Sequence, residues 1–588
     1  GLVGAKDGCS RGQCGACTVI IDKKAVRACT RKMKQLEGVV VETVEGLAQN
    51  GELHPLQQAF LYCHAFQCGF CTPGIIMASK ALLDADPHPT DDQIKQAIKF
   101  NICRCTGYKQ VIDAVRLAIE IADGATKLDV FDNRGWVGDN PVVKNGVERV
   151  MGQPLFTDDF HIDNCLQGRV VFPAYPHAKI LSIDCAEALK QPGVVAIATH
   201  KDIPGKKFFS QELFPQQILA IDKVRFIGDP IAVVYAESAQ QAYDAMPFIK
   251  VEYEVLPVIA TAEQGYDPES CRVHEEYPNN FANRHVQKGD VERGFAASDV
   301  IVESDVSVGT LEHGRLELDA ALAELDEKGR LVVYGTGQNP SHMRHDICKA
   351  MNLTEEQIRL VTRPAGGAFG KLEDLVCHIF AALGTMMTKR PVRVTLTRDE
   401  VNAYTTKRHA LKFHYKVGAA KDGRILAMQT FTLGDTGAYS SLGDFLNSCT
   451  ATMGSGPYEA PNVDFNSHMM FTNNPIAGCF RGYGSTQVSV AVETVLDQVA
   501  EKLNLSPFEL RRVNGLSSGK QTPSGQIIEY SCGFHDTINA VQTAFEKDGL
   551  PAPSAPGKKV GFGVAGGFKY MGFGNGMEDG AGCSIDLR

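Results

Sequence analysis

The chain has 588 residues, of which 44% are hydrophobic and 22% charged, and its formal net charge is −10. This length is enough for several domains, and the composition is that of a soluble globular protein. The negative charge argues against a nucleic-acid partner, because phosphate binding needs a basic surface. No apolar run of about 18 residues occurs, so the sequence predicts no membrane-spanning helix and no membrane partner.

Cysteines crowd the first 105 residues in two sets of four. The first set opens with C-x4-C-x2-C, the spacing of plant-type [2Fe–2S] ligation, and the second combines C-x2-C with C-x-C. Structural zinc and a disulfide framework are the alternatives. Zinc sites usually pair C-x2-C with C-x2-C or with histidines, and disulfide frameworks are typical of small secreted domains. The candidate ligands are Cys9, Cys14, Cys17 and Cys29 in the first set and Cys68, Cys71, Cys103 and Cys105 in the second.

Three stretches, GCSRGQCGACTV, QCGFCTPG and CRCTGY, together resemble the iron–sulfur half of the xanthine oxidase family of molybdenum hydroxylases. This family includes xanthine dehydrogenases and bacterial aldehyde oxidoreductases. The resemblance implies two [2Fe–2S] clusters, since all eight cysteines fall where the family has ligands. It also implies a molybdenum–molybdopterin cofactor, in the pterin dinucleotide form, which Gln67 would touch.

In chain order, the sequence predicts a multidomain α+β fold. The chain is expected to be cut at both ends, because no hairpin precedes the first cysteine loop and a new strand is expected just before Arg588. The predicted regions are a partial [2Fe–2S] ferredoxin-type β-grasp at 1–45, a four-helix [2Fe–2S] domain at 46–122, a linker at 123–145, an α/β hammerhead domain at 146–260 and the first part of the molybdenum-cofactor region at 261–588.

The linker is rich in Gly, Asp and Asn, and its 23 residues cannot bury the core of a flavin domain. No G-x-G-x-x-G follows a strand and opens a helix, so no dinucleotide fold is predicted. The resemblance therefore implies no FAD in this chain and a separate redox acceptor, such as a flavoprotein subunit, a flavodoxin or a ferredoxin. A homodimer is left open, and unpaired-looking cysteines favour a reducing, cytoplasmic compartment.

Three loops in the last region carry the predicted substrate chemistry. Gln338 ends a predicted strand and could donate a hydrogen bond without adding charge, although it could also be a polar turn residue. In the loop GGAFGKLE, the amides of Phe369 and Gly370, close to Gly367, could approach an oxo group or the pterin. Glu373 is expected at the start of the next helix, where it either binds a purine-like ring, as the resemblance implies, or stabilises the helix dipole.

The third loop, CFRGYG, resembles the family's FRG[FY]G loop. Arg481 could orient a substrate carbonyl and stabilise developing negative charge, with a structural salt bridge as the alternative. The family's base is a glutamate in a Gly-Glu loop that has no counterpart before Arg588, and neither Glu317 nor Glu578 is assigned that role.

The resemblance implies a hydroxylase that oxidises a small molecule with oxygen from water and passes electrons from molybdenum through the two clusters to an external acceptor. The substrate would be a purine-like N-heterocycle, towards which Glu373 points, or an aldehyde. Two other functions remain open: an iron–sulfur electron-transfer subunit without substrate chemistry, and a zinc-dependent interaction protein.

Overall fold

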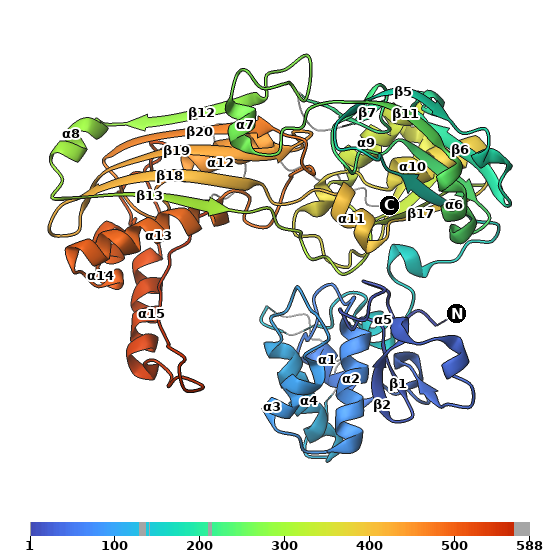
Figure 1. Cartoon of the computed structure of the whole chain (residues 1–588). Helices are drawn as coiled ribbons and strands as arrows, with labels where there is room; N and C mark the ends of the chain where they lie inside the picture. The colour runs from blue at the N-terminus through green and yellow to red at the C-terminus, as the bar shows by residue number, and fades with distance from the viewer. Residues whose placement is uncertain (1, 129–136, 140, 210–213, 570–588) are drawn as a thin grey trace, which may run out of the picture. The chain divides into compact units, whose positions relative to one another are not determined.

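The computed structural model describes residues 2–128, 137–139, 141–209 and 214–569 (Figure 1). Part of the predicted linker and the strand expected before Arg588 lie outside the described residues. The chain divides into two compact units: Gly1–Leu256 with Glu312–Thr406, and Pro257–Leu311 with Lys407–Arg588.

The first unit begins with a small sheet and four helices. The sheet has the order β2-β1-β3, with β1 at Thr18–Ile21, β2 at Lys24–Arg27 and β3 at Val41–Glu42. The helices are α1 (Pro55–Tyr62), α2 (Thr72–Ala85), α3 (Asp91–Ile98) and α4 (Lys109–Ala122). Buried side chains such as Phe60, Ile75 and Val111 form their common core. The four predicted helices are confirmed, and the short helix α5 (Gly146–Met151) packs on α1 and α2.

A seven-stranded mixed sheet joins two stretches that are distant in sequence. Its order is β16-β15-β14-β17-β4-β10-β6. The strands are β4 (Leu166–Val171), β6 (Val194–Thr199), β10 (Ala232–Ala236), β14 (Ala320–Leu325), β15 (Leu331–Gly335), β16 (Ile358–Thr362) and β17 (Val392–Thr395). The helices packed on it are α6 (Ala239–Ala245), α9 (Pro340–Met351) and α10 (His378–Thr388). All five residues of β10 are apolar and buried, as expected of a strand that is covered on both faces of the sheet.

The remaining elements of this unit are short. They are the sheet β11-β5-β9, with β5 at Ala178–Asp184, β9 at Lys223–Val224 and β11 at Lys250–Val255, the hairpin of β7 (Phe208–Phe209) and β8 (Gln216–Gln217), and α11 (Arg398–Tyr404).

The pair β15 and β16 positions the candidate site. These strands are parallel and in register, with Gly335 opposite Thr362. Carboxyl ends of adjacent parallel strands meet at one edge of a sheet, which is where ligands bind in open α/β sheets. The loop after β15, which holds Gln338, and the loop after β16, which holds Gly366–Gly370, therefore leave the same edge.

The second unit is built on a five-stranded sheet with the order β12-β20-β19-β18-β13. The strands are β12 (Asn280–Lys288), β13 (Val300–Val308), β18 (Ala410–Ala419), β19 (Ile425–Gly437) and β20 (Asn462–Phe471). Alternate residues of β18, such as Leu411 and Phe413, are buried, and α12 (Gly443–Thr452) and α13 (Ser485–Leu503) complete this core. The other helices are α7 (Ala262–Tyr266), α8 (Val291–Ala296), α14 (Pro507–Asn514) and α15 (Phe534–Asp548).

The predicted α+β class is confirmed by these separate sheets and helical layers. None of the helices in the described residues is both long enough and apolar enough to span a membrane.

Candidate functional site

The first cysteine set lies in the loop before β1 and in the turn after β2. Its thiols come together as two pairs, Cys9 with Cys14 and Cys17 with Cys29. Backbone amides point at the sulfurs: the Gly12 N–H donates to Cys29 Sγ at 3.3 Å, and the Cys14 N–H donates to Cys9 Sγ at 3.5 Å. Such donors stabilise thiolate charge.

The second set lies at two helix starts. Cys71 is the residue before α2, and the segment with Cys103 and Cys105 precedes α4. The four thiols of this set lie next to one another: Cys105 contacts both Cys103 and Cys68, and Cys103 contacts Cys71. The Cys103 N–H donates to the Tyr108 hydroxyl at 2.8 Å, which fixes this turn.

The two cysteine loops are bonded to each other. The Ile102 N–H donates to the Cys14 carbonyl at 2.8 Å, and the Asn101 side chain donates to the Gly15 carbonyl at 2.9 Å. Gly15 has φ 70°, and a Cβ there would lie 2.3 Å from the Phe100 carbonyl. Only glycine fits this approach.

All eight cysteines are free thiols. Burial raises the pKa of Cys14 to about 12 and that of Cys17 to about 11. Thiolates are costly to bury without a compensating cation, and two pairs of thiols supply the four ligands of a [2Fe–2S] cluster. The donor chemistry of both sets is therefore of the iron–sulfur type. No group of three or more His, Cys, Asp or Glu side chains arranged for a metal ion occurs among the described residues, and the ligand assignment stays a prediction.

Gln338 and the glycine loop come together at the end of the sheet. Gln338 Nε2 donates to Glu373 Oε1 at 3.1 Å, and Gln338 Oε1 accepts the Gly370 N–H at 3.0 Å. Phe369 has φ 59°, a left-handed conformation that is costly for a bulky residue and is found preferentially at functional sites. The structure thus brings together Gln338, Phe369, Gly370 and Glu373.

Two details differ from the prediction. Glu373 does not start a helix: it ends a 3-10 turn at Lys371–Glu373, and α10 begins at His378, so the helix-dipole role is wrong. The Gly370 amide, expected to face a cofactor, is bonded to Gln338, because the 3-10 turn carries the loop back towards that side chain. Burial raises the pKa of Glu373, and the His342 charge acts in the opposite direction.

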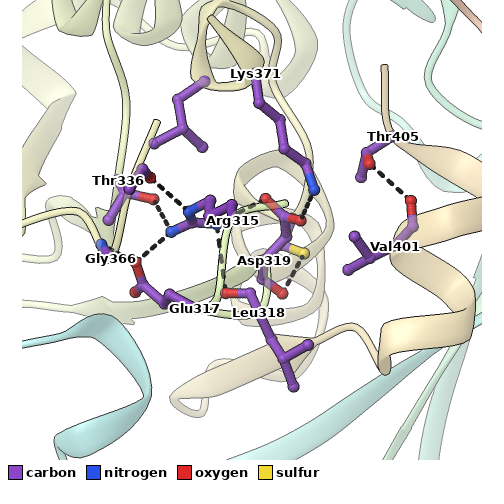
Figure 2. Close-up of polar contacts among 12 residues, drawn as sticks. Arg315, Glu317, Leu318, Asp319, Thr336, Gly366, Lys371, Val401 and Thr405 are labelled. Carbon is purple, nitrogen blue, oxygen red and sulfur yellow. Dashed lines mark hydrogen bonds and ion pairs between the residues drawn. The ribbon is translucent and has the colours of Figure 1, made fainter. Parts of the chain in front are cut away.

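A buried ionic network lies beneath the glycine loop (Figure 2). The Arg315 guanidinium is fully buried and contacts Glu317, Asp319 and the Thr336 hydroxyl. Lys371 is also fully buried, and its Nζ lies 2.8 Å from Asp319 Oδ2. Burial alone would raise the pKa of Asp319, but the nearby ammonium and guanidinium lower it.

This network holds the glycine loop by its backbone. Arg315 Nε donates to the Gly367 carbonyl at 2.8 Å, and the Gly366 N–H donates to Glu317 Oε2 at 2.6 Å. A Cβ added at Gly366 would lie 2.4 Å from the Glu317 Cβ and 3.0 Å from the Phe70 ring. Phe70 lies between Cys68 and Cys71 in the second cysteine loop. The site loop is therefore packed directly on the second cysteine loop.

Two arginines fasten the cysteine loops to the same segment, 313–316. Arg398, at the start of α11, donates to the carbonyls of Gly8, Arg315 and Leu316 at 2.6–3.0 Å. Arg104, between Cys103 and Cys105, donates to the His313 carbonyl at 3.1 Å.

Gln67, predicted to touch the pterin, is exposed beside Cys68. The neighbouring Gly69 has φ 86°, and a Cβ there would lie 2.3 Å from Arg149 Cδ. Arg149 Nε in turn donates to the Cys68 carbonyl at 3.1 Å. The Gln67 turn is thus shaped by packing on Arg149.

Arg481 belongs to the second unit, between β20 and α13. Its side chain is exposed, and it has no ion-pair partner within the described parts of the chain, so the structural salt bridge finds no support there. Arg408 braces the loop instead: its Nη2 donates to the Arg481 carbonyl at 3.0 Å, and its guanidinium stacks 3.8 Å from the Phe480 ring centroid.

The residues that sequence reasoning missed are the buried charges Arg315, Asp319 and Lys371 and the fastening arginines Arg104, Arg149 and Arg398. The run RLELD alternates charged and apolar residues, which is also the pattern of a half-exposed strand. The sequence held one weak indication that these charges are buried: the apolar stretch AALAEL, which has a single charge, follows RLELD directly.

Three protein-family models match the chain. A [2Fe-2S] binding domain matches residues 43–116, the a/b hammerhead domain of aldehyde oxidase and xanthine dehydrogenase matches 151–257, and a molybdopterin cofactor-binding domain matches 273–515. These matches support the predicted hammerhead and cofactor-binding regions and a cofactor set of the molybdopterin and [2Fe–2S] types.

Known proteins and solved structures agree with these models. The aldehyde oxidoreductase of Megalodesulfovibrio gigas is 35% identical over an alignment of 590 positions, which covers 96% of this chain and 65% of that protein. The nicotinate dehydrogenase large molybdopterin subunit of Eubacterium barkeri is 35% identical over 402 residues, which are 68% of this chain and 94% of that subunit. The structure of the aldehyde oxidoreductase from Desulfovibrio gigas aligns with a TM-score of 0.88 at 34% identity, over 93% of this chain and 62% of that one. The chain therefore belongs to the xanthine oxidase family of molybdenum hydroxylases.

Proposed function

We propose that this chain is the iron–sulfur part and the first part of the molybdenum site of a hydroxylase that oxidises a small molecule with oxygen from water. The observation that carries the proposal is the convergence of Gln338, Gly370 and Glu373 on a loop that is packed against the second cysteine loop. An electron carrier without substrate chemistry would need no such polar loop.

A bound molybdenum cofactor would supply a two-electron acceptor for the substrate, and the clusters would supply one-electron centres. Gln338 and the glycine loop would hold the cofactor, in its pterin dinucleotide form, with Gln67 on the pterin. The first four cysteines would hold the outer cluster and the second four the inner one. Arg481 would orient the substrate and stabilise negative charge that develops on it.

We favour an N-heterocyclic substrate over an aldehyde, because Glu373 offers a carboxylate beside Gln338 that can hydrogen-bond a ring nitrogen or its proton. The names of the relatives include both substrate classes. A separate flavoprotein, flavodoxin or ferredoxin would accept the electrons, and this chain would hold no FAD.

Metal analysis and spectroscopy of the complete purified enzyme test this proposal. We expect iron together with molybdenum, and two distinct [2Fe–2S] signals in low-temperature EPR of the dithionite-reduced protein. Cys103→Ser should remove one signal and leave the other. Iron without molybdenum would favour the electron-transfer alternative, and zinc alone would favour an interaction protein.

The substrate class is tested by Glu373→Val. Loss of a charge-assisted hydrogen bond costs about 1.5–3 kcal/mol, so kcat/KM for an N-heterocycle should fall by about tenfold or more. Aldehyde turnover should be spared. Equal losses for both substrate classes would contradict a substrate-binding role.

A further inference from the structure

Six cations surround Cys29 in the sequence: Lys23, Lys24, Arg27, Arg31, Lys32 and Lys34, here called the basic rim. Between residues 22 and 35 the one acid is Asp22, although the whole chain has a net charge of −10. Five of the six side chains are exposed, Arg27 is half-buried, and none forms an ion pair with another described residue. The basic rim is therefore a positively charged surface on a chain whose net charge is negative.

The basic rim lies directly on the first cysteine set. The Gly12 N–H bonds to Cys29 Sγ, and Thr30 and Arg27 are the side chains that a Cβ at Gly12 would meet. Cys9 and Cys29 are half-buried, whereas Cys14 and Cys17 are buried. Cys29, one of the two more accessible cysteines of this set, is thus bordered by the cations.

Exposed apolar groups accompany the charge. Met33, inside the rim, is 82% exposed, and Phe100, whose ring lies 4.5 Å from the Arg27 guanidinium, is 55% exposed. Lysine on an edge strand can serve to prevent pairing with another sheet, and β2 is an edge strand. This role can explain Lys24, which lies in β2. It does not explain Arg31, Lys32 and Lys34, because they come after the strand.

We propose that the basic rim is the docking surface for an acidic one-electron carrier protein of the flavodoxin type. This inference rests on the proposed function. Oxidation of one substrate molecule with oxygen from water releases two electrons and two protons, so two carrier molecules are each reduced by one electron and the protons pass to solvent. Complementary charge steers such encounters and raises association rates, while small redox interfaces allow rapid release.

The test uses the complete enzyme and an acidic flavodoxin as the probe. The rim variant carries Lys24→Glu, Arg31→Glu and Lys34→Glu. The control carries Lys547→Glu, Lys558→Glu and Lys559→Glu, exposed positions of the second unit with the same change in charge. At low ionic strength we expect the rim variant to lose about tenfold or more in kcat/KM for flavodoxin, since steering contributes 10- to 1,000-fold to on-rates. Its turnover with an artificial dye should match the wild type.

Salt and direct binding complete the test. Wild-type reduction of flavodoxin should slow as salt rises, and the rim variant should be nearly insensitive. Flavodoxin binding by calorimetry needs no substrate turnover, so it separates this inference from failure of the proposed activity. Equal losses in the control variant, unchanged flavodoxin binding by the rim variant, or rim-dependent binding of anionic phospholipid vesicles instead of flavodoxin would overturn the proposal. If the rim variant loses its EPR signals, Lys24→Gln with Lys34→Gln takes its place, with a smaller loss expected.

Discussion

At the residue scale, the side-chain amide of Gln338 is held at both ends. Its oxygen accepts from Gly370 and its nitrogen donates to Glu373, so both ends of one amide are held by one loop. An exposed glutamine normally samples many rotamers, and two bonds to a tight turn remove that freedom. A fixed amide can orient a bound group at no cost in reorganisation.

The raised pKa of Glu373 leads to a pH prediction. The carboxylate accepts from Gln338 Nε2, so the ordered arrangement is lost as pH falls through a pKa that lies above the ordinary 4.5. We expect the kcat/KM of the complete enzyme to show an acid limb with a midpoint above 4.5. Glu373→Gln should remove this limb, as measured from pH–rate profiles. An unchanged limb in Glu373→Gln would assign it to another group.

Arg315 provides a stability prediction at the same scale. Arg315→Leu leaves Glu317 and Asp319 buried without their shared cation, which typically costs about 3–5 kcal/mol in the free energy of unfolding. Urea unfolding should show the loss in the transition that reports the first unit. Arg424→Leu, which breaks an exposed pair with Asp422, is the matched control and should change little. If both variants lost a similar free energy of unfolding, burial of the ion pair would not be the cause of the loss in Arg315→Leu.

At the element scale, α11 and the segment 313–316 fasten the cysteine loops to the site. Arg398 at the first position of α11 reaches three carbonyls, one of them beside Cys9. Arg104 reaches His313 from the second cysteine loop. Bonds from charged donors to carbonyls contribute about 1.5–3 kcal/mol each, so both side chains stabilise the packing of the cysteine loops on this segment.

We therefore expect Arg398→Ala to loosen residues 1–122 while leaving both clusters intact. Hydrogen exchange should rise at the loop around Gly8 and at 313–316, and substrate-driven reduction of the clusters should slow. The EPR signals should stay as in the wild type. Arg116→Ala, at an exposed arginine of α4, is the control. Unchanged exchange at Gly8 would contradict the fastening role.

At the scale of the whole molecule, electrons must leave through a protein partner if the chain holds no flavin. The complete enzyme should turn over substrate with an artificial dye and should not reduce NAD until a flavoprotein is added. Absorbance at 340 nm follows NADH directly. Stoichiometric FAD in this chain, or NAD reduction without a partner, would refute this expectation.

The sequence by itself determined the spacing of the two cysteine sets and the four helices. These features depend on local spacing and periodicity, which survive without knowledge of the partner segments. The convergence of Gln338 with the glycine loop was also within reach, since consecutive strands of this type commonly pair in parallel.

Tertiary structure alone decided the rest. It placed Glu373 in a 3-10 turn instead of a helix and occupied the Gly370 amide with Gln338, because both depend on how a loop folds back on its neighbour. It also buried Arg315, Asp319 and Lys371 together, although each reads as a surface charge. A buried charge is stable only when opposite charges from distant segments meet it, and no local pattern reports which segments will meet.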